Sequence, residues 1–312
     1  MADDRLNPEF RHTALLYRGS DGFVDRVLPF LQEGLSHGSA LMVATSDQKV
    51  ARLQEALGDQ SEQVEFHDMA EVGRNPATIL PLWLDFASRN RGRPLRGVGE
   101  PIWRGRTEDE LVECVHHESL LNLAFDARTD LTLVCPYDAA ALPQEVLAEA
   151  RRTHPLLDFG QGDVRCPDYV PSHLTRAPYE GDLPHPPAGA TAVDYASEEL
   201  PRLRRLVADR ALAAGFPAAR AMDLALAVHE LATNSVRHGG GSGRLVWWED
   251  EGSLVCEVRD AGRLEEPLLG RVRPAEDAKG GRGLWIVNQL CDLVQIRSGD
   301  GTNRVRIRVD PR

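Results

Sequence analysis

Residues from about 10 to 175 alternate short apolar runs with amphipathic segments, which is the pattern of strands followed by helices. Short aliphatic runs predict strands at 13–17, 40–44, 64–67, 95–98 and 131–135. Helical periodicity predicts helices at about 22–36, 47–57, 76–90, 107–125 and 143–153. Thr107 and Glu110 have the spacing of a capping box at the start of the fourth helix. This regular alternation predicts an α/β domain with a largely parallel sheet that is covered on both faces.

The periodicity stops at residues 176–192, where prolines at 178, 184, 186 and 187 favour an extended connector. We therefore expect a Pro-rich linker at 176–192 between domains at 10–175 and 193–311. A chain of 312 residues is long enough for two domains that each bury a core.

The second domain has a different order of elements. The pattern predicts two helices at about 197–214 and 218–237, strands near 245–249 and 254–259, a helix at about 283–291, and strands at 293–297 and 304–309. Strands joined by short turns, with helices grouped before and between them, predict an α+β two-layer sandwich.

Composition narrows the classes of function. The net charge of -12 argues against direct nucleic-acid binding, which needs clustered Lys and Arg. No apolar run approaches the length of about 18 residues that a membrane helix needs, and the N-terminus lacks the pattern of a signal peptide. The five cysteines are odd in number and scattered, so a disulfide framework is not expected. We expect a cytoplasmic protein with no membrane or nucleic-acid partner.

One helix of the second domain carries a polar stripe. Glu230, Asn234 and His238 recur every four residues, which places them on one helix face, and glycines at 239–241 end the helix. A carboxylate, an amide and an imidazole on one face could hold a metal–phosphate group and provide a proton acceptor. A solvated helix face explains Glu230 and Asn234 equally well when they are taken alone, and for His238 the helix dipole is the favoured explanation.

Three further pieces of this domain bear chemistry. Asp260 and Gly262 end a strand, where the carboxylate can accept a hydrogen bond from an exocyclic amine and the glycine lets a flat ring approach. Glycines at 280, 281 and 283 surround Arg282 at the start of a helix, and such a start favours phosphate. Thr302 follows a late glycine, where its hydroxyl could close a base pocket.

Taken together, in this order and spacing, the four pieces resemble the GHKL (Bergerat) ATP-binding fold, and most closely the anti-sigma-factor serine kinases. The resemblance covers about residues 193–310 and includes the string GRGLWIVNQLCD. It implies a Mg²⁺ ligand at Asn234, adenine recognition at Asp260 with Gly262, and a general base at Glu230. It also implies a phosphate lid at Gly281, Arg282, Gly283 and Leu284, and a role for Thr302 at the base. ATP and Mg²⁺ are the implied cofactors.

One departure from the family pattern opens an alternative. The family motif Asp-x-Gly-x-Gly has Leu264 in place of its second glycine, and a long connection with prolines at 267 and 274 follows. The alternative to a kinase is therefore a degenerate or non-catalytic module that sequesters a partner through the same fold.

The first domain lacks the Gly-x-x-x-x-Gly-Lys-[Ser/Thr] motif of P-loop enzymes. Its segments HTALLYRG, GEPIW, ECVHHESLLNLAF and CPYD resemble the MEDS sensory domain, a ligand-sensing module with a RecA-like core. Together the two halves resemble the RsbA family of anti-sigma regulators. This implies partner switching with a sigma factor and a STAS-type anti-anti-sigma protein, a small-molecule ligand at the first domain, and a homodimer as one assembly to consider.

A metal site in the first domain is a further hypothesis. Cys114, His117 and Glu118 fall within one helical turn, and His12 or Cys135 could complete the ligand set. The spacing lacks the paired ligands of zinc motifs, so the favoured interpretation is a buried thiol beside hydrogen-bonded histidines.

Overall fold

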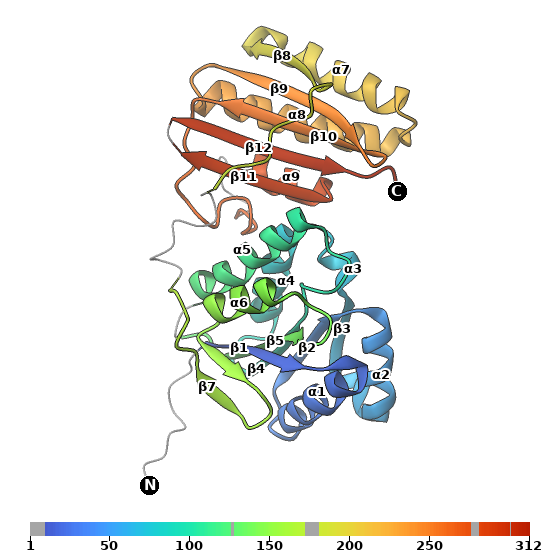
Figure 1. Cartoon of the computed structure of the whole chain (residues 1–312), viewed down its shortest axis with the longest axis vertical. Coiled ribbons are helices and arrows are strands. Elements are labelled where there is room, and N and C mark those ends of the chain that lie inside the picture. The colour runs from blue at the N-terminus through green and yellow to red at the C-terminus, as the bar shows by residue number, and fades with distance from the viewer. Residues whose placement is uncertain (1–9, 126–127, 172–180, 276–280, 300) are drawn as a thin grey trace. The chain divides into compact units, whose positions relative to one another are not determined.

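The computed structural model describes residues 10–125, 128–171, 181–275, 281–299 and 301–312 (Figure 1). The chain divides into two compact units, residues 1–175 and residues 176–312. Each unit is built around its own sheet.

The first unit contains a seven-stranded sheet in the order β3-β2-β4-β5-β1-β6-β7. All of its neighbouring strands pair in parallel except β6 and β7, which form an antiparallel pair. This confirms the predicted, largely parallel α/β fold. The strands are β1 (Arg11–Tyr17), β2 (Ala40–Thr45), β3 (Val64–Asp68), β4 (Leu95–Gly99), β5 (Leu131–Asp138), β6 (Leu156–Asp158) and β7 (Asp163–Arg165).

Helices cover both faces of this sheet (Figure 1). One face carries α1 and α2, with Phe23, Leu31 and Leu53 buried against strand residues such as Val43. The other face carries α4, α5 and α6, and the predicted capping box of Thr107 and Glu110 opens α5. The helices are α1 (Gly19–Ser36), α2 (Asp47–Leu57), α3 (Met69–Val72), α4 (Ile79–Arg89), α5 (Glu108–Ala124) and α6 (Gln144–Thr153), with 3-10 turns at Gly58–Gln63 and Pro76–Thr78.

The second unit is an antiparallel five-stranded sheet in the order β11-β12-β10-β9-β8. Its helices lie together on one face, as Figure 1 shows, which confirms the α+β two-layer sandwich. Its elements are β8 (Thr191–Ala196), α7 (Leu200–Ala213), α8 (Ala218–His238), β9 (Ser242–Asp250), β10 (Ser253–Asp260), α9 (Arg282–Leu290), β11 (Leu293–Gly299) and β12 (Thr302–Val309), with a 3-10 turn at Ser197–Glu199 before α7.

The alternation along β10 decides which residues meet the helices. Cys256 and Val258 point into the helix-covered core, where they are buried with Val228 of α8 and Ile307 of β12. Glu257 points to the opposite face and is fully buried there beneath arginines. Asp260 ends the strand at the edge of the core, close to the C-terminal end of α8.

None of the described helices combines the length and the apolar composition that crossing a bilayer requires.

Candidate functional site

The polar stripe of α8 faces the first turn of α9. A Cβ atom placed on Gly283 would lie 3.1 Å from Oε2 of Glu230 and 3.1 Å from Nδ2 of Asn234. The absence of a side chain at Gly283 therefore lets the start of α9 lie directly against both polar groups. The fold brings Gly283 of α9 next to Glu230 and Asn234 of α8, although more than forty positions of sequence separate Gly283 from either of them.

Asp260 is held in place from three directions. Its Oδ2 accepts hydrogen bonds from Oγ of Ser235 (2.7 Å) and Nδ2 of Asn303 (3.3 Å), and its Oδ1 accepts one from the backbone N–H of Gly262 (2.8 Å). A carboxylate with several donors on one side has a fixed orientation. The Asp260 side chain nevertheless remains partly exposed to solvent.

Asn234, Asp260 and Gly283 border one cleft with a volume of about 480 Å³, which is within the usual range for small-molecule sites. The predicted base Glu230 is not among the described residues that line it. The cleft has an apolar part, formed by Leu231, Val258, Leu284 and Val305, and polar groups of Asn234, Asp260 and Asn303. The predicted site residues that line it are Asn234, Asp260, Gly262, Gly281, Gly283 and Leu284, and His238 lines it as well.

The start of α9 has the backbone conformation and polarity that suit an anion. Gly281 is its N-cap residue and has φ +81°, a left-handed conformation that side chains other than glycine disfavour. The first N–H groups of a helix have no partner within the helix, and the helix dipole favours a negative group at that end. Arg282, the next predicted lid residue, is exposed there, and Gly280 lies outside the described residues.

Asn303 is a site residue that the sequence prediction missed. It pairs directly with Asp260 across β10 and β12, and the cleft is lined by Asn303. Thr302, the predicted residue, lies one position earlier and borders a neighbouring depression with Gly301. Strand alternation was the available signal, because adjacent residues of a strand point to opposite faces.

The cleft fits an aminopurine nucleotide on two observations. Oδ1 of Asn303 is buried without a hydrogen-bond partner among the described residues, so an acceptor stands next to the Asp260 carboxylate. A Cβ on Gly262 would come within 2.8 Å of Oδ1 of Asp260 and 3.1 Å of the carbonyl oxygen of His238, so a glycine is needed at this close approach. An apolar floor, paired acceptors and an open helix start are the features that a base with attached phosphates requires.

The segment after β10 forms one wall of the cleft. Leu264 stands where the family pattern has its second glycine, and Leu264 and Leu269 both line the cleft. The backbone N–H of Leu264 donates to Oγ of Ser298 (2.9 Å), and Nδ2 of Asn288 on α9 donates to the carbonyl of Gly270 (2.8 Å). The described part of the connection is therefore attached to both β11 and α9.

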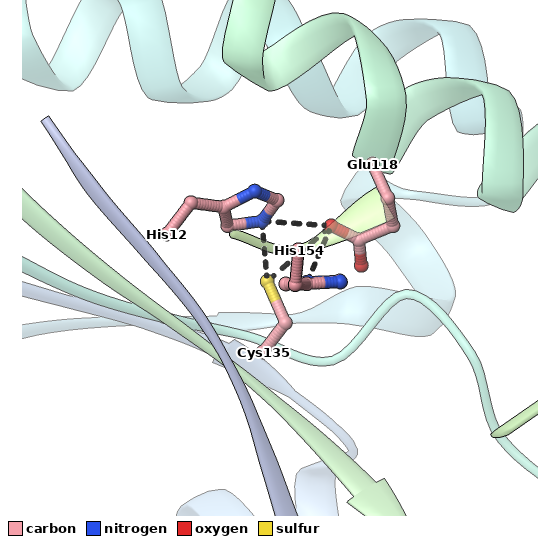
Figure 2. A group of neighbouring side chains, drawn as sticks. All are labelled: His12, Glu118, Cys135 and His154. Atoms are coloured by element: carbon pink, nitrogen blue, oxygen red, sulfur yellow. Dashed lines mark hydrogen bonds and ion pairs between the residues drawn. The ribbon is translucent and has the colours of Figure 1, made fainter. Parts of the chain in front are cut away.

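The first unit contains a separate buried cluster of His12, Glu118, Cys135 and His154, shown in Figure 2. The sequence hypothesis groups Cys114 and His117 with Glu118 in one ligand set, which His12 or Cys135 could complete. Among the described residues, the cluster takes Glu118, His12 and Cys135 from that set but adds His154 in place of Cys114 and His117. Cys114 instead donates to the carbonyl of Pro101 (3.3 Å), and burial raises the pKa of its thiol to about 12. Trp83 is a core residue of the same unit, 1% exposed.

Comparisons with known proteins agree with both halves of this description. Residues 11–155 match the MEDS family, described as the MEthanogen/methylotroph, DcmR Sensory domain. Residues 194–309 match the histidine kinase-like ATPase domain. The chain thus carries a MEDS domain followed by a histidine kinase-like ATPase domain, and both resemblances seen in the motifs are confirmed. The comparison with curated proteins found no match.

Two solved structures are similar to part of this chain at low identity. The first contains the RsbU and RsbW domains of a Mycobacterium tuberculosis protein, with 16% identity and a TM-score of 0.30 over 40% of this chain and 33% of that chain. The second is the Acinetobacter baumannii histidine kinase AdeS, with 12% identity and a TM-score of 0.24 over 39% of this chain and 68% of that chain. Neither likeness is close enough to assign a ligand or a partner to this chain.

Proposed function

We propose that this chain, a MEDS domain joined to a histidine kinase-like ATPase domain, is a Mg-ATP-dependent regulator of a sigma factor. In this proposal the second domain binds the sigma factor and phosphorylates a serine or threonine of a STAS-type anti-anti-sigma partner. The MEDS domain controls that activity in response to a ligand. The observation that carries the proposal is a cleft lined by Asn234, Asp260 and Gly283. Glu230 lies beside this cleft, next to Gly283 at the start of α9.

The base end of the cleft is assigned to Asp260 and Asn303. Their oxygens are hydrogen-bond acceptors, and an exocyclic amine is the donor that they would recognise together. Gly262 leaves room beside them, and Leu231, Val258 and Val305 supply apolar contact for a ring. Selectivity for adenine over guanine follows, since guanine presents a carbonyl oxygen where adenine has its amine.

The phosphate end is assigned to the start of α9 and to Asn234. The backbone N–H groups of Gly281 and Gly283 would hold phosphate oxygens, and the amide oxygen of Asn234 would be a ligand of Mg²⁺. When bound, Mg²⁺ neutralises the charge that develops on the phosphates during transfer.

Glu230 is assigned as the general base. Its carboxylate lies on the same side of α8 as Asn234, beside the first turn of α9, where an attacking hydroxyl would meet the phosphates. It would take the proton of the partner's serine or threonine as the new oxygen–phosphorus bond forms and the bond from the γ-phosphorus to the leaving ADP breaks. Replacing its charge with a neutral amide removes this acceptor but preserves the shape of the side chain.

A second function is favoured by a specific observation. Leu264 replaces a glycine of the family motif and lines the cleft, so the wall beside the base is bulkier and less adjustable than that pattern allows. Under this alternative the domain binds its partner without transferring phosphate.

The experiment that separates the two combines nucleotide titration with a transfer assay. Purified full-length chain is titrated with ATP in the presence of Mg²⁺, and is then incubated with γ-labelled ATP and each STAS-domain protein of the source organism. We expect saturable ATP binding and label on one partner. Glu230→Gln should reduce transfer by about 10²-fold or more while ATP binding stays within about twofold. Glu249→Gln, an exposed carboxylate on β9, is the matched control and should transfer normally.

One outcome would decide against the kinase, and another against the role of Glu230. ATP binding without transfer to any partner leaves the binding module as the function. Transfer that survives in Glu230→Gln at the wild-type rate removes Glu230 from its assigned role.

A further inference from the structure

The buried cluster of the first unit joins four separate elements. His12 is on β1, Cys135 on β5, Glu118 on α5, and His154 directly follows α6. All four side chains are at most 1% exposed. One ligand atom from each lies within 4.8 Å of the others, and Figure 2 shows the four groups pointing toward one another. A carboxylate, a thiol and two imidazoles are an unusual set to bury together without a cation.

Four of the six distances between these ligand atoms are close to the edges of a small tetrahedron. Oε2 of Glu118 lies 3.1 Å from Nε2 of His12 and 3.4 Å from Nε2 of His154. Sγ of Cys135 lies 3.4 Å from Oε2 of Glu118 and 3.4 Å from Nε2 of His12. Zinc–ligand bonds of about 2.0–2.3 Å in a tetrahedral site place neighbouring ligand atoms roughly 3.3–3.7 Å apart. These four distances differ from the zinc values by a few tenths of an ångström, and the other two pairs lie within 4.8 Å.

The hydrogen bonds around His12 fix which nitrogen points into the cluster. Nδ2 of Asn122 donates to the carbonyls of Glu118 and Thr153, so Oδ1 of Asn122 is left to accept from Nδ1 of His12 (3.0 Å). With its proton on Nδ1, the neutral imidazole directs the lone pair of Nε2 toward Glu118 and Cys135.

His154 is oriented in the same way. Its Nδ1 donates to the carbonyl of Ala150 (2.8 Å), which leaves Nε2 as the inward nitrogen. That Nε2 is buried without a hydrogen bond and faces Oε2 of Glu118 at 3.4 Å. Two imidazoles whose outer N–H groups are anchored to an amide or a carbonyl, with their inner nitrogens directed at the same carboxylate oxygen, have the arrangement found around protein-bound metals. Tyr137 adds a hydrogen bond from its hydroxyl to Oε1 of Glu118 (3.3 Å), which orients the carboxylate.

We propose that His12, Glu118, Cys135 and His154 bind one divalent transition-metal ion of the zinc type. Two imidazole nitrogens, one thiolate and one carboxylate oxygen form a four-coordinate set that suits Zn²⁺ and is too soft for Mg²⁺ or Ca²⁺. On binding, the Cys135 thiol loses its proton to solvent and its sulfur becomes a ligand. With four protein ligands and no exposed side, the site is closed, so the ion holds β1 and β5 to α5 and α6 and performs no chemistry on a substrate.

The first arm of the test measures metal content. Full-length chain is produced in zinc-supplemented medium, washed with a chelator, and analysed for metal by mass spectrometry. We expect about one zinc per chain. Cys135→Ala and His154→Ala should each retain at least about tenfold less metal than the wild type. The matched control is Cys114→Ala, which removes an equally buried thiol from α5 outside the cluster and should keep its zinc.

The second arm does not depend on the folding of any variant. Wild-type chain is unfolded, stripped of metal and refolded with Co²⁺ alone, and its absorption spectrum is recorded. Tetrahedral Co²⁺ bands together with a thiolate-to-cobalt charge-transfer band are expected. Less than about a tenth of an ion per chain in both the zinc-grown and the refolded wild type would overturn the proposal. Wild-type metal content in the folded Cys135→Ala and His154→Ala variants would overturn it as well.

Discussion

Gly262→Ala is the sharpest test of the geometry at the base end of the cleft. The new methyl group would lie 2.8 Å from Oδ1 of Asp260, 3.1 Å from Cα of Gly239 and 3.1 Å from the carbonyl oxygen of His238. Ordinary contact begins at 3.4 Å, so the carboxylate must retreat by about 0.6 Å, and two backbone atoms by about 0.3 Å each. The backbone of Gly262 does not have a positive φ, so the perturbation is steric and involves no left-handed strain.

The expected cost is moderate in stability and larger in binding. Crowding of this size in a packed region costs about 1–3 kcal/mol of unfolding free energy. The retreat of Asp260 also lengthens its 2.8 Å hydrogen bond from the Gly262 N–H and moves the acceptor that the adenine amine would use. We expect the affinity for Mg-ATP to fall by at least about tenfold, which corresponds to about 1.4 kcal/mol.

Urea unfolding of the full chain, followed by circular dichroism, measures the first effect, and calorimetric titration with Mg-ATP on the folded protein measures the second. Gly299→Ala is the matched control, because a Cβ there meets nothing within 4 Å and the residue does not have a positive φ. Gly299→Ala should change neither quantity appreciably. If folded Gly262→Ala binds ATP with wild-type affinity, Gly262 does not border the nucleotide, and the assignment of Asp260 to the base is wrong.

Two further predictions address the start of α9 and the sheet face opposite the helices. Gly281→Ala should lower the free energy of unfolding in urea by about 1–2 kcal/mol, because φ is +81° there and the surrounding open space rules out a clash. Gly281→Asn should lower it less, since asparagine tolerates the left-handed conformation better. Equal losses for the two variants would contradict this explanation. Burial alone would raise the pKa of Glu257, but hydrogen bonds and charges from Arg304, Arg306 and Arg259 hold it below its usual value. The ionised Glu257 carboxylate therefore stabilises the folded state fully above its unfolded-state pKa near 4.5, and this stabilisation is lost as the pH falls through the lower folded-state pKa. Glu257→Gln should lower the free energy of unfolding by about 3 kcal/mol at neutral pH and should flatten its dependence on pH in acid. An acid unfolding profile identical to that of the wild type would contradict this assignment.

Long, strongly periodic elements were predictable from the sequence, while short edge elements were not. The helix predicted at 218–237 is α8, Ala218–His238, because a buried stripe repeats along its whole length. By contrast, β6 and β7 have three residues each, too few to display an alternation. β8 begins at Thr191, inside the predicted linker 176–192, and only Tyr195 of its six residues is buried. An edge strand that is mostly exposed carries no apolar signal to distinguish it from a connector.

The candidate sites show the same division between local and long-range information. Glu230 and Asn234 are neighbours on one helix, so spacing alone placed them together. For the metal cluster, sequence proximity pointed to Cys114 and His117, whereas the fold brings in His154 from the end of α6. Nothing local marks His154, because its partners on β1, β5 and α5 are defined only once the strand order places β1 between β5 and β6.

Leu264 departs from the family motif and also lines the cleft, so this one residue bears on how the cleft differs from the family pattern. A second glycine at that point would leave the wall beside the base open and the connection free to move. Here the Leu264 amide is fixed to Ser298, and its side chain packs against the core while lining the cleft with Leu269. Because the fixed wall is apolar, the substitution favours retention of a flat ring against Leu264 and Leu269. Under the proposed function the phosphates would lie at the other end of the cleft, near Gly281, away from this wall. We therefore expect Leu264 to lower the rate of phosphoryl transfer more than the affinity for ATP.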